Sequence, residues 1–353
     1  MSHTKLSVGI VGLPNVGKST LFKALTHKQV DINNYPFCTI EPNIGIVTVP
    51  DHRLQALSEF SQTEKIVPAV VEFVDIAGLV KGASDGEGLG NKFLANIREV
   101  DAIIQIVRVF ENPDIIHVHN TIDPENDIEV INTELILSDL ETVTKRRDKT
   151  MKEVRANRKG AVEEVAILEA LTTGLEQGLL GNTVILPGDP NESGRFLKEL
   201  SLLTAKPFLY VYNMSDIEAA LPPALASRPH VRLDIKIEEE LNEMTKEEQA
   251  EFGLSTHLPE LIREAYSLLG LMTFFTTGVQ ETRAWTILRG STAPQAGAAI
   301  HSDFQEKFIR AEVIFWEKLI ATGSWAAAKE QGVLRLEGKE YRVQDGDVMI
   351  FKI

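Results

Sequence analysis

The feature that most constrains this chain is a glycine-rich stretch near its start. Residues 12–19 read Gly-Leu-Pro-Asn-Val-Gly-Lys-Ser, which fits the pattern G-x-x-x-x-G-K-[ST]. A β-branched apolar run, residues 7–11, precedes the stretch, and a helix-like segment, residues 19–26, follows it. A strand, a glycine-rich loop and a helix in this order are the setting of a phosphate-binding loop. The alternative is an ordinary glycine turn between a strand and a helix.

The residue types in this loop suit the binding of a nucleoside triphosphate and a metal ion. Gly12 and Gly17 allow backbone N–H groups to turn inward around an anion, and the following helix directs its positive N-terminal end at the phosphates. Lys18 is expected to reach the β- and γ-phosphates, and the Ser19 hydroxyl to bind Mg²⁺. The predicted nucleotide-binding residues of the loop are Asn15, Val16, Gly17, Lys18, Ser19 and Thr20.

Composition and charge narrow the class of protein. The chain has 353 residues, 43% hydrophobic and 25% charged, which is long enough for two or three globular domains. No apolar run approaches the ~20 residues of a membrane span. Residues 1–5 hold no apolar signal core, and the single cysteine, Cys38, allows no internal disulfide. We therefore expect a cytoplasmic protein without a membrane partner. With a net charge of −15, nucleic-acid binding needs a local basic patch, and DNA is not an expected partner.

A second motif ends a predicted buried strand, residues 69–78. It reads D-x-x-G, in which Asp75 is expected to hold Mg²⁺ through water and the Gly78 N–H to contact the γ-phosphate. In the proline-containing loop before it, Thr39 is the candidate hydroxyl that reaches Mg²⁺ and senses the γ-phosphate. Leu79 stands where switch NTPases commonly carry a water-orienting glutamine. We therefore expect catalysis through another group, or slow hydrolysis until a partner helps.

Two loops near these motifs add candidates. Residues 81–91 carry four glycines, which predicts a second switch, with a flexible linker as the alternative. His117 and His119 follow a predicted strand, residues 102–109, and either would bring a titrating group to the γ-phosphate. The alternative for both is an ordinary loop or core histidine.

The base-binding residues are expected at the ends of two strands. Phe110 closes the strand of residues 102–109, at the edge of a parallel sheet where ligands bind. Residues 206–212 form another strand, and the following Asn213-Met214-Ser215-Asp216 resembles the base-recognition motif N-K-x-D with methionine replacing lysine. The Asp216 carboxylate suits the N1–H and N2–H₂ donors of guanine, whereas Asn213 serves either purine. The residues alone leave the base open.

The middle of the chain changes to a helical pattern. From about residue 127, two apolar stripes flank a turn signal at residues 157–160, which predicts a helical hairpin, partly coiled coil. Near the turn, residues 145–159 carry eight Lys and Arg against two Asp and Glu. A solvated helix face is one interpretation of this excess, and an RNA-facing arm is the other.

The last part of the chain, from about residue 270, indicates a small α+β domain. Short predicted strands cover residues 282–288, 311–315, 339–343 and 348–353, with a helix near residues 304–307. The domain has ten Lys and Arg and ten Asp and Glu, so its charge does not argue for RNA. It has no metal-ligand or nucleophile pattern.

Long motifs across the whole chain resemble the Obg-like ATPase (YchF) family of translation-factor-related P-loop NTPases. They include residues 12–20, 35–43, 75–84, 283–287 and 345–348. The resemblance implies an α/β fold in three parts. A discontinuous nucleotide-binding G domain covers residues 1–126 and 202–269, an α-helical coiled-coil hairpin is inserted at residues 127–201, and a C-terminal β-grasp TGS domain covers residues 270–353.

The resemblance also implies an activity and its residues. The resemblance implies that this chain hydrolyses ATP in preference to GTP. It also implies that the chain associates with ribosomes in translation and stress responses. Phe110 and Asn213 match positions that hold adenine, and the Met214 backbone is placed to read its N6 edge. His117 matches a histidine implicated in hydrolysis, and Asn15 matches a position linked to a monovalent cation such as K⁺.

Two departures and two rival functions remain. Asp216 replaces the glutamate common in the family, and Asp234 stands where a small residue is more usual. The prediction is a Mg²⁺-dependent ATPase with ribosomal RNA or the ribosome as partner, and the rivals are a GTP-specific switch and a nucleotide-gated scaffold. The predicted catalytic residues are Lys18, Thr39, Gly78 and His117. The predicted metal ligands are Ser19, Thr39 and Asp75.

Overall fold

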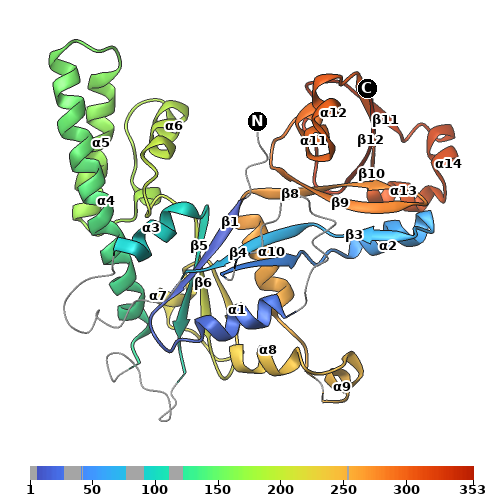
Figure 1. Ribbon diagram of the computed structural model, residues 1–353, viewed down its shortest axis with the longest axis horizontal. Coiled ribbons are helices and arrows are strands. Elements are labelled where there is room, and N and C mark those ends of the chain that lie inside the picture. Colours follow the sequence, from blue (N-terminus) through green and yellow to red (C-terminus); the bar gives the residue numbers. More distant parts are fainter. Residues whose placement is uncertain (1–5, 28–40, 42, 77–90, 111–121, 253) are drawn as a thin grey trace.

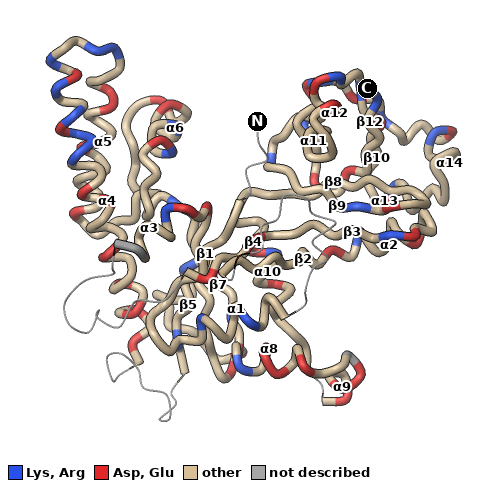
Figure 2. The backbone as a smooth tube through the Cα atoms, viewed as in Figure 1, with Lys and Arg blue, Asp and Glu red and all other residues tan. Residues whose placement is uncertain are grey.

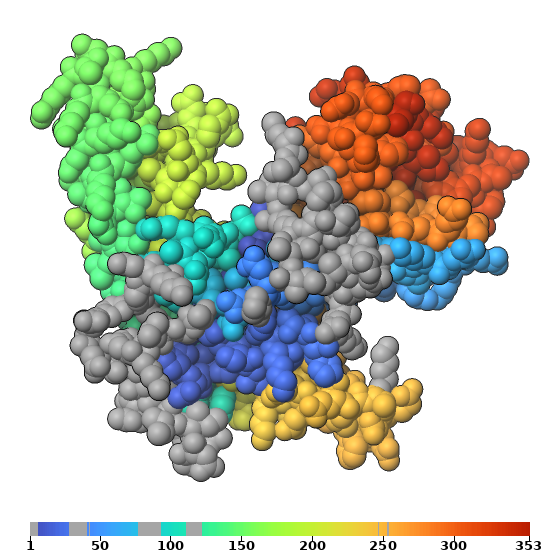
Figure 3. Space-filling view, viewed as in Figure 1, coloured from blue at the N-terminus to red at the C-terminus, as the bar shows by residue number. Residues whose placement is uncertain are grey.

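The computed structural model describes residues 6–27, 41, 43–76, 91–110, 122–252 and 254–353. These residues form two sheets of six strands each. A helical hairpin extends from one side of the first sheet, and the second sheet lies on the other side (Figure 1). In the space-filling view the hairpin and the C-terminal unit rise separately from the unit that contains the first sheet (Figure 3). Among the described residues, no helix is both long enough and apolar enough to cross a membrane.

The first sheet has the strand order β2-β4-β1-β5-β6-β7. Its strands are β1 (Ser7–Gly12), β2 (Ile44–Thr48), β4 (Val70–Asp75), β5 (Ala102–Arg108), β6 (Phe208–Asn213) and β7 (His230–Leu233). Only β2 runs antiparallel, beside β4; the other four pairings are parallel. Central strands β1, β5 and β6 are buried along their whole length, as their near-continuous apolar runs require. The carboxyl ends of five strands therefore meet at one edge of the sheet.

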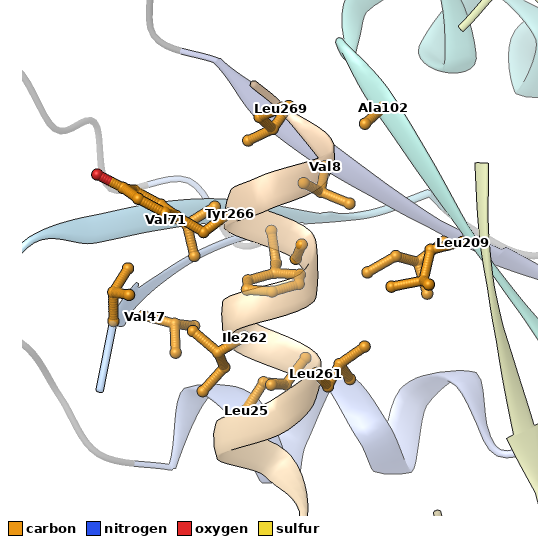
Figure 4. Packing of buried hydrophobic residues seen from close by; sticks show 14 of the residues in the cluster. Val8, Leu25, Val47, Val71, Ala102, Leu209, Leu261, Ile262, Tyr266 and Leu269 are labelled. Carbon is orange, nitrogen blue, oxygen red and sulfur yellow. The ribbon is translucent and has the colours of Figure 1, made fainter. Parts of the chain in front are cut away.

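Helices cover both faces of this sheet and bury its core. They are α1 (Lys18–Thr26), α3 (Asn91–Glu99), α7 (Pro223–Ala226), α8 (Ile235–Leu241) and α10 (Leu258–Leu268). Helix α9 (Lys246–Glu251) follows α8 and lies away from the sheet. Figure 4 shows α10 lying across the sheet, with Leu261 and Ile262 directed into the core. Tyr266 of the same helix is buried and donates to the Met272 carbonyl oxygen at 3.0 Å, which ties α10 to the second sheet. Burial raises the pKa of the Tyr266 hydroxyl to about 12.

The predicted helical hairpin is present. Its long helix α4 (Pro124–Arg155) is followed by α5 (Ala161–Glu176), η3 (Gly181–Thr183) and α6 (Pro190–Leu200). Asp123 caps α4 by accepting from the Asn126 N–H, and proline occupies the first turn. The turn lies at residues 157–160 as predicted, where Asn157 and Gly160 adopt the left-handed backbone (φ 54° and 80°).

Helix α4 contributes to three hydrophobic cores, and its first turns reach a small one through Ile128, which lies with Tyr210 and Tyr212 of β6. Ile131 and Leu135, near its start, are buried in the core of the first sheet. Ile136 and Val143 are buried in a separate core with α5 and α6. One continuous helix therefore connects the sheet to the far end of the hairpin.

The second sheet has the order β11-β10-β12-β8-β9-β3. Its strands are β3 (Lys65–Val67), β8 (Leu271–Thr277), β9 (Glu281–Leu288), β10 (Arg310–Phe315), β11 (Arg335–Glu337) and β12 (Asp347–Lys352). The helices near it are α2 (His52–Ser61), α11 (Ala293–Ile300), α12 (Ser302–Glu306), α13 (Trp316–Thr322) and α14 (Trp325–Glu330). Residues 339–343, predicted as a strand, form only an isolated bridge from Arg342 to Thr292. Strand β3 lies between β2 and β4 in the chain, yet it pairs with β9 of the C-terminal unit.

Candidate functional site

The phosphate-binding loop connects β1 to α1, as the sequence predicts. Two residues of the loop adopt the left-handed backbone: Asn15 (φ 64°) and Gly17 (φ 105°). At Gly17 a Cβ atom would lie 2.8 Å from the Asn213 Nδ2, so this position is restricted by its neighbour as well as by its backbone. At Gly12 a Cβ atom would lie 2.8 Å from the Val16 side chain. Steric contacts within the protein therefore require glycine at both positions of the motif, whether or not a ligand is bound.

The predicted catalytic lysine, Lys18, and the predicted metal-binding carboxylate, Asp75, meet at this loop. Asp75 ends β4 and is aligned with Ile10 of β1, so parallel pairing brings it beside the loop. The Lys18 Nζ donates a hydrogen bond to the Asp75 Oδ1, with both side chains largely buried. Ser19, in the first turn of α1, is exposed. A carboxylate and a hydroxyl are oxygen donors of the kind that Mg²⁺ prefers, so these residues fit the expected ion.

The Asn213 side chain joins three segments of the site. It is 6% exposed at the end of β6. Its Nδ2 donates to the Val16 carbonyl oxygen at 2.9 Å, and its Oδ1 accepts from the Ile235 N–H at 3.2 Å. Both ends of the amide are therefore bonded within the protein, and Asn213 fixes the phosphate-binding loop against the start of α8.

The segment after Asn213 presents one exposed carboxylate. Met214 is buried, and its N–H donates to the Leu233 carbonyl oxygen at 2.8 Å. Asp216 is exposed, and its Oδ1 accepts from the Glu218 N–H at 3.0 Å, which closes a turn. The Arg232 guanidinium donates to the Ile217 carbonyl oxygen at 3.2 Å and so braces the same turn from β7.

Asp234, one of the two departures from the family pattern, has a structural role. Its carboxylate caps α8 by accepting from the N–H groups of Lys236 and Ile237, at 3.1 and 3.0 Å. A capping carboxylate satisfies unpaired donors in the first turn and complements the helix dipole. This accounts for an aspartate at the position without a base-reading function.

Sequence reasoning missed Arg108, which lies under Phe110. Arg108 is 1% exposed at the end of β5 and aligned with Asn213. Its guanidinium carbon lies 4.7 Å from the centre of the Phe110 ring, and its Nε donates to the Phe110 carbonyl oxygen at 3.1 Å. One buried cation thus holds both the ring and the backbone of the aromatic residue. The signal was a charged residue inside the apolar run of residues 102–109.

Several predicted site residues lie outside the described part of the chain. These are Thr39, Gly78 and His117, together with Leu79. Their roles remain predictions. The structure brings together Lys18, Ser19 and Asp75 with the ends of β5 and β6, which carry Phe110 and Asn213.

Comparisons with known proteins cover the full length of the chain. A family model described as "50S ribosome-binding GTPase" matches residues 7–159, and a YchF C-terminal family model, described as a protein of unknown function, matches residues 271–353. The Ribosome-binding ATPase YchF of Bacillus subtilis is 50% identical over 98% of this chain and 99% of its own length. The Haemophilus influenzae protein of the same name is 48% identical over 98% of each chain.

A solved structure agrees with the sequence relatives. The chain aligns with the Schizosaccharomyces pombe YchF GTPase with a TM-score of 0.88 and 35% identity, covering 100% of this chain and 99% of that one. The predicted α/β fold of the P-loop GTPase type and the predicted P-loop nucleoside triphosphatase are thereby confirmed. From the motifs, the fold and these likenesses together, we conclude that the chain belongs to the YchF family.

Proposed function

We propose that this chain hydrolyses ATP, and GTP less readily, to the diphosphate and phosphate, and that it does so as a ribosome-associated switch in translation or stress responses. Lys18 would hold the β- and γ-phosphates, and Ser19, Thr39 and Asp75 would hold Mg²⁺, which would supply positive charge beside the transferring phosphoryl group. Gly78 contacts the γ-phosphate, and His117 assists the attack of water. The two bacterial relatives reported above are named as ribosome-binding ATPases, which supports the ribosome as partner.

One observation carries this proposal. The Lys18 Nζ contacts the Asp75 carboxylate beside the glycine-rich loop. The lysine expected to bind phosphate and the carboxylate expected to bind the metal ion are therefore next to each other. A triphosphate there would separate the pair, because the lysine would bond phosphate oxygen and the carboxylate would face the metal ion. No nucleophilic side chain is needed, since phosphoryl transfer to water relies on positioning and charge stabilisation.

Guanine is a second candidate for the base that the site binds, beside adenine. Phe110, Asn213 and the Met214 backbone suit adenine, whereas the exposed Asp216 carboxylate is complementary to the N1–H and N2–H₂ of guanine. The names of the relatives differ in the same way, since the S. pombe protein is called a GTPase and the bacterial proteins ATPases. A GTP-specific switch is therefore the second candidate function.

The finer architecture is also proposed. Residues 1–126 and 202–269 form the nucleotide-binding domain, residues 127–201 a coiled-coil arm and residues 270–353 a β-grasp TGS domain. The antiparallel α4–α5 pair and the mixed second sheet support this division. We further propose a cytoplasmic location, and a K⁺ ion held near Asn15.

Steady-state hydrolysis tests the proposal. Lys18→Ala should lower ATP turnover about a hundredfold or more, as expected for loss of a transition-state contact. Lys23→Ala is the control, because Lys23 is exposed in the same helix and pairs with Glu239. Hydrolysis by Lys18→Ala at the wild-type rate would contradict the proposal. If hydrolysis is lost but ribosome association and cellular function persist, the scaffold interpretation is correct.

Binding of labelled ATP and GTP decides the base. Tighter binding of ATP to the wild-type chain supports the ATPase. Tighter binding of GTP that weakens in Asp216→Glu supports the second candidate, because the longer side chain breaks the turn that Asp216 closes and displaces its carboxylate from the guanine edge.

A further inference from the structure

The turn that follows the base-recognition motif is bonded both internally and from a neighbouring strand. Within this turn, residues 216–219, which we call the Asp216 turn, the Ala219 N–H donates to the Asp216 carbonyl oxygen at 3.3 Å, and the Glu218 N–H donates to the Asp216 Oδ1 at 3.0 Å. From β7, the Arg232 Nη1 donates to the carbonyl oxygens of Ile217 and Ala219, at 3.2 and 3.3 Å. A single guanidinium nitrogen therefore bonds two carbonyl groups of the same turn.

Strand β7 places Arg232 at this turn. Arg232 is aligned with Tyr212 of β6, and the next residue, Leu233, is aligned with Asn213. The Leu233 carbonyl oxygen accepts from the Met214 N–H at 2.8 Å, so β7 holds the motif through its backbone directly beside the residue that holds the turn. Arg232 is half-buried, and water therefore competes only in part for its hydrogen bonds.

The Arg232 guanidinium bonds carbonyl groups in an acidic part of the molecule. The helices that follow β7, in residues 235–251, carry seven Glu and two Lys, and Figure 2 shows this concentration of acidic residues on α8 and α9. Even so, no ion pair found among the described residues includes Arg232. Hydrogen bonds from a cation to carbonyl oxygen are stronger than those between neutral groups. Arg232 is therefore placed to fix the direction of the turn.

The direction of the turn matters because it carries the Asp216 carboxylate. A carboxylate opposite guanine accepts from N1–H and N2–H₂, whereas the same carboxylate opposite adenine meets the lone pair of N1. Asp216 is exposed, so side-chain packing does not fix its position, and its place depends on the turn. A group that is held in place before the ligand arrives loses less conformational entropy on binding and discriminates more sharply.

We propose that Arg232 is a positioning residue that sets how strongly the site discriminates between adenine and guanine nucleotides. It holds the Asp216 turn in a fixed place relative to Asn213, which is itself bonded to the phosphate-binding loop. Without Arg232 the turn keeps its internal bonds but shifts relative to the sheet, and the Asp216 carboxylate then adapts to either base. This inference rests on the proposed function, and it names a residue outside the motif that controls the choice of nucleotide.

The test uses the full-length chain and three single variants. Arg232→Met keeps most of the side-chain length and removes the donors, whereas Arg232→Lys keeps the positive charge and an N–H donor group. Arg228→Met is the matched control, because Arg228 is also half-buried, lies just before β7 and packs its guanidinium carbon 5.5 Å from the centre of the Tyr210 ring. Thermal unfolding shows that each variant is folded.

Equilibrium binding of labelled ATP and GTP gives the main result as the ratio of the two dissociation constants. In Arg232→Met this ratio should move toward one by about threefold or more, the effect expected from losing a hydrogen bond. Arg228→Met should keep the wild-type ratio, and Arg232→Lys should lie between the wild type and Arg232→Met. An unchanged ratio in Arg232→Met would overturn the inference.

Inorganic tripolyphosphate separates positioning of the base from a general loss of structure. It has phosphates but no base, so it should bind the wild type and Arg232→Met with equal affinity, as measured by calorimetry. An equal loss of affinity for ATP, GTP and tripolyphosphate in Arg232→Met would mean that Arg232 only supports the fold, and the inference would be wrong.

Combining Arg232→Met with Asp216→Ala tests the route of the effect. If Arg232 acts through the turn, the double variant should have the same ratio as Asp216→Ala alone, because the carboxylate that the turn positions is absent. A further change of the ratio in the double variant would mean that Arg232 affects the base by another route, which contradicts the inference.

Hydrolysis by the wild type distinguishes failure of this inference from failure of the proposed function. A chain that hydrolyses neither ATP nor GTP contradicts the proposed function, and the inference fails with it. A chain that hydrolyses nucleotide and keeps its discrimination in Arg232→Met retains the proposed function and overturns the inference alone.

Discussion

At the scale of single residues, the site is held by bonds that its ligand does not supply. Asn213 uses both ends of its amide to join the phosphate-binding loop to α8, and Arg108 supports Phe110. Lys18, Ser19 and Asp75 were predictable because their motifs have fixed spacing. The bonds of Asn213 were not, because they join segments that only the folded sheet brings together. The contact of Arg108 with Phe110 is local in sequence, but it depends on a side-chain orientation that the apolar run does not specify.

Arg108 gives the prediction at this scale. Replacing it with methionine removes the cation under the Phe110 ring and the bond to the Phe110 carbonyl oxygen. The KM for nucleotide should rise about three- to tenfold, since each contact contributes on the order of 1 kcal/mol, while kcat changes less than about twofold. Arg108→Lys should rescue only in part, because an ammonium cannot stack as a planar group.

A double-mutant cycle shows whether Arg108 acts through Phe110. If it does, Phe110→Leu/Arg108→Met should bind nucleotide no more weakly than Phe110→Leu alone. Losses that simply add would mean that Arg108 acts elsewhere, and thermal unfolding of each variant reveals any general loss of stability.

At the scale of elements, α4 is fixed to the sheet by a buried carboxylate. The Asp139 side chain accepts from the N–H groups of Leu203 and Thr204, at 2.9 and 2.7 Å, and from the Thr204 hydroxyl at 2.7 Å. These bonds bring the chain back from the hairpin to the start of β6. The sequence indicated two helices and a turn from apolar spacing. It did not indicate that residues 203–204 would contact α4 at Asp139, because this contact joins residues about 65 positions apart.

Asp139→Asn tests this junction. The amide retains one acceptor but directs its NH₂ group at the Thr204 donors, so the free energy of unfolding should fall by about 1–3 kcal/mol. Asp148→Asn, at an exposed position of α4, should have little effect. Urea unfolding followed by circular dichroism measures both, and an unchanged Asp139→Asn would show that the three bonds contribute little.

Comparing the wild type with Asp139→Asn also tests how stability depends on pH. Burial raises the pKa of Asp139, and the hydrogen bonds from Thr204 and Leu203 offset this only in part. The folded state therefore holds the proton more tightly than the unfolded state, so the contribution of Asp139 to stability is greatest below the unfolded pKa of about 3.9. It declines as pH rises through the folded pKa. The stability advantage of the wild type over Asp139→Asn should accordingly be smaller at pH 7 than at pH 4.

At the scale of the whole molecule, the C-terminal unit is joined to the segment between β2 and β4. Strand β3 pairs with β9, and Thr63 of the same segment donates to the Gly278 carbonyl oxygen at 2.8 Å. The sequence pattern did not indicate β3, because three residues are too few for a strand pattern and its partner lies in another part of the chain. In the chain, β2 and β4 flank this segment, and the predicted γ-phosphate sensors Thr39 and Gly78 lie just beyond those strands.

Among the described residues, the Arg53–Asp345 pair is the shortest ion pair across this junction. The Arg53 Nη1 donates to the Asp345 Oδ2 at 2.6 Å, and its guanidinium carbon lies 5.1 Å from the centre of the Phe275 ring. Asp345 also accepts from the Thr273 N–H at 2.9 Å. Partial burial alone would lower the pKa of Arg53, but hydrogen bonds to Asp51 and Asp345 outweigh it and keep the guanidinium charged.

A double-mutant cycle on Arg53→Ala and Asp345→Ala should give a coupling free energy of about 1 kcal/mol. The figure is modest because Asp345 is 42% exposed and water screens the pair. Lys65 and Glu281 provide the control across the same junction: the Lys65 side chain is 53% exposed and the charged atoms are 3.9 Å apart, so their coupling should be near zero. Hydrogen exchange should also quicken in β8 and β9 of Arg53→Ala, since one of the bonds that fix this unit to α2 is lost. Equal coupling for the two pairs would mean that the C-terminal unit is held by strand pairing and apolar contact alone, with no specific contribution from Arg53.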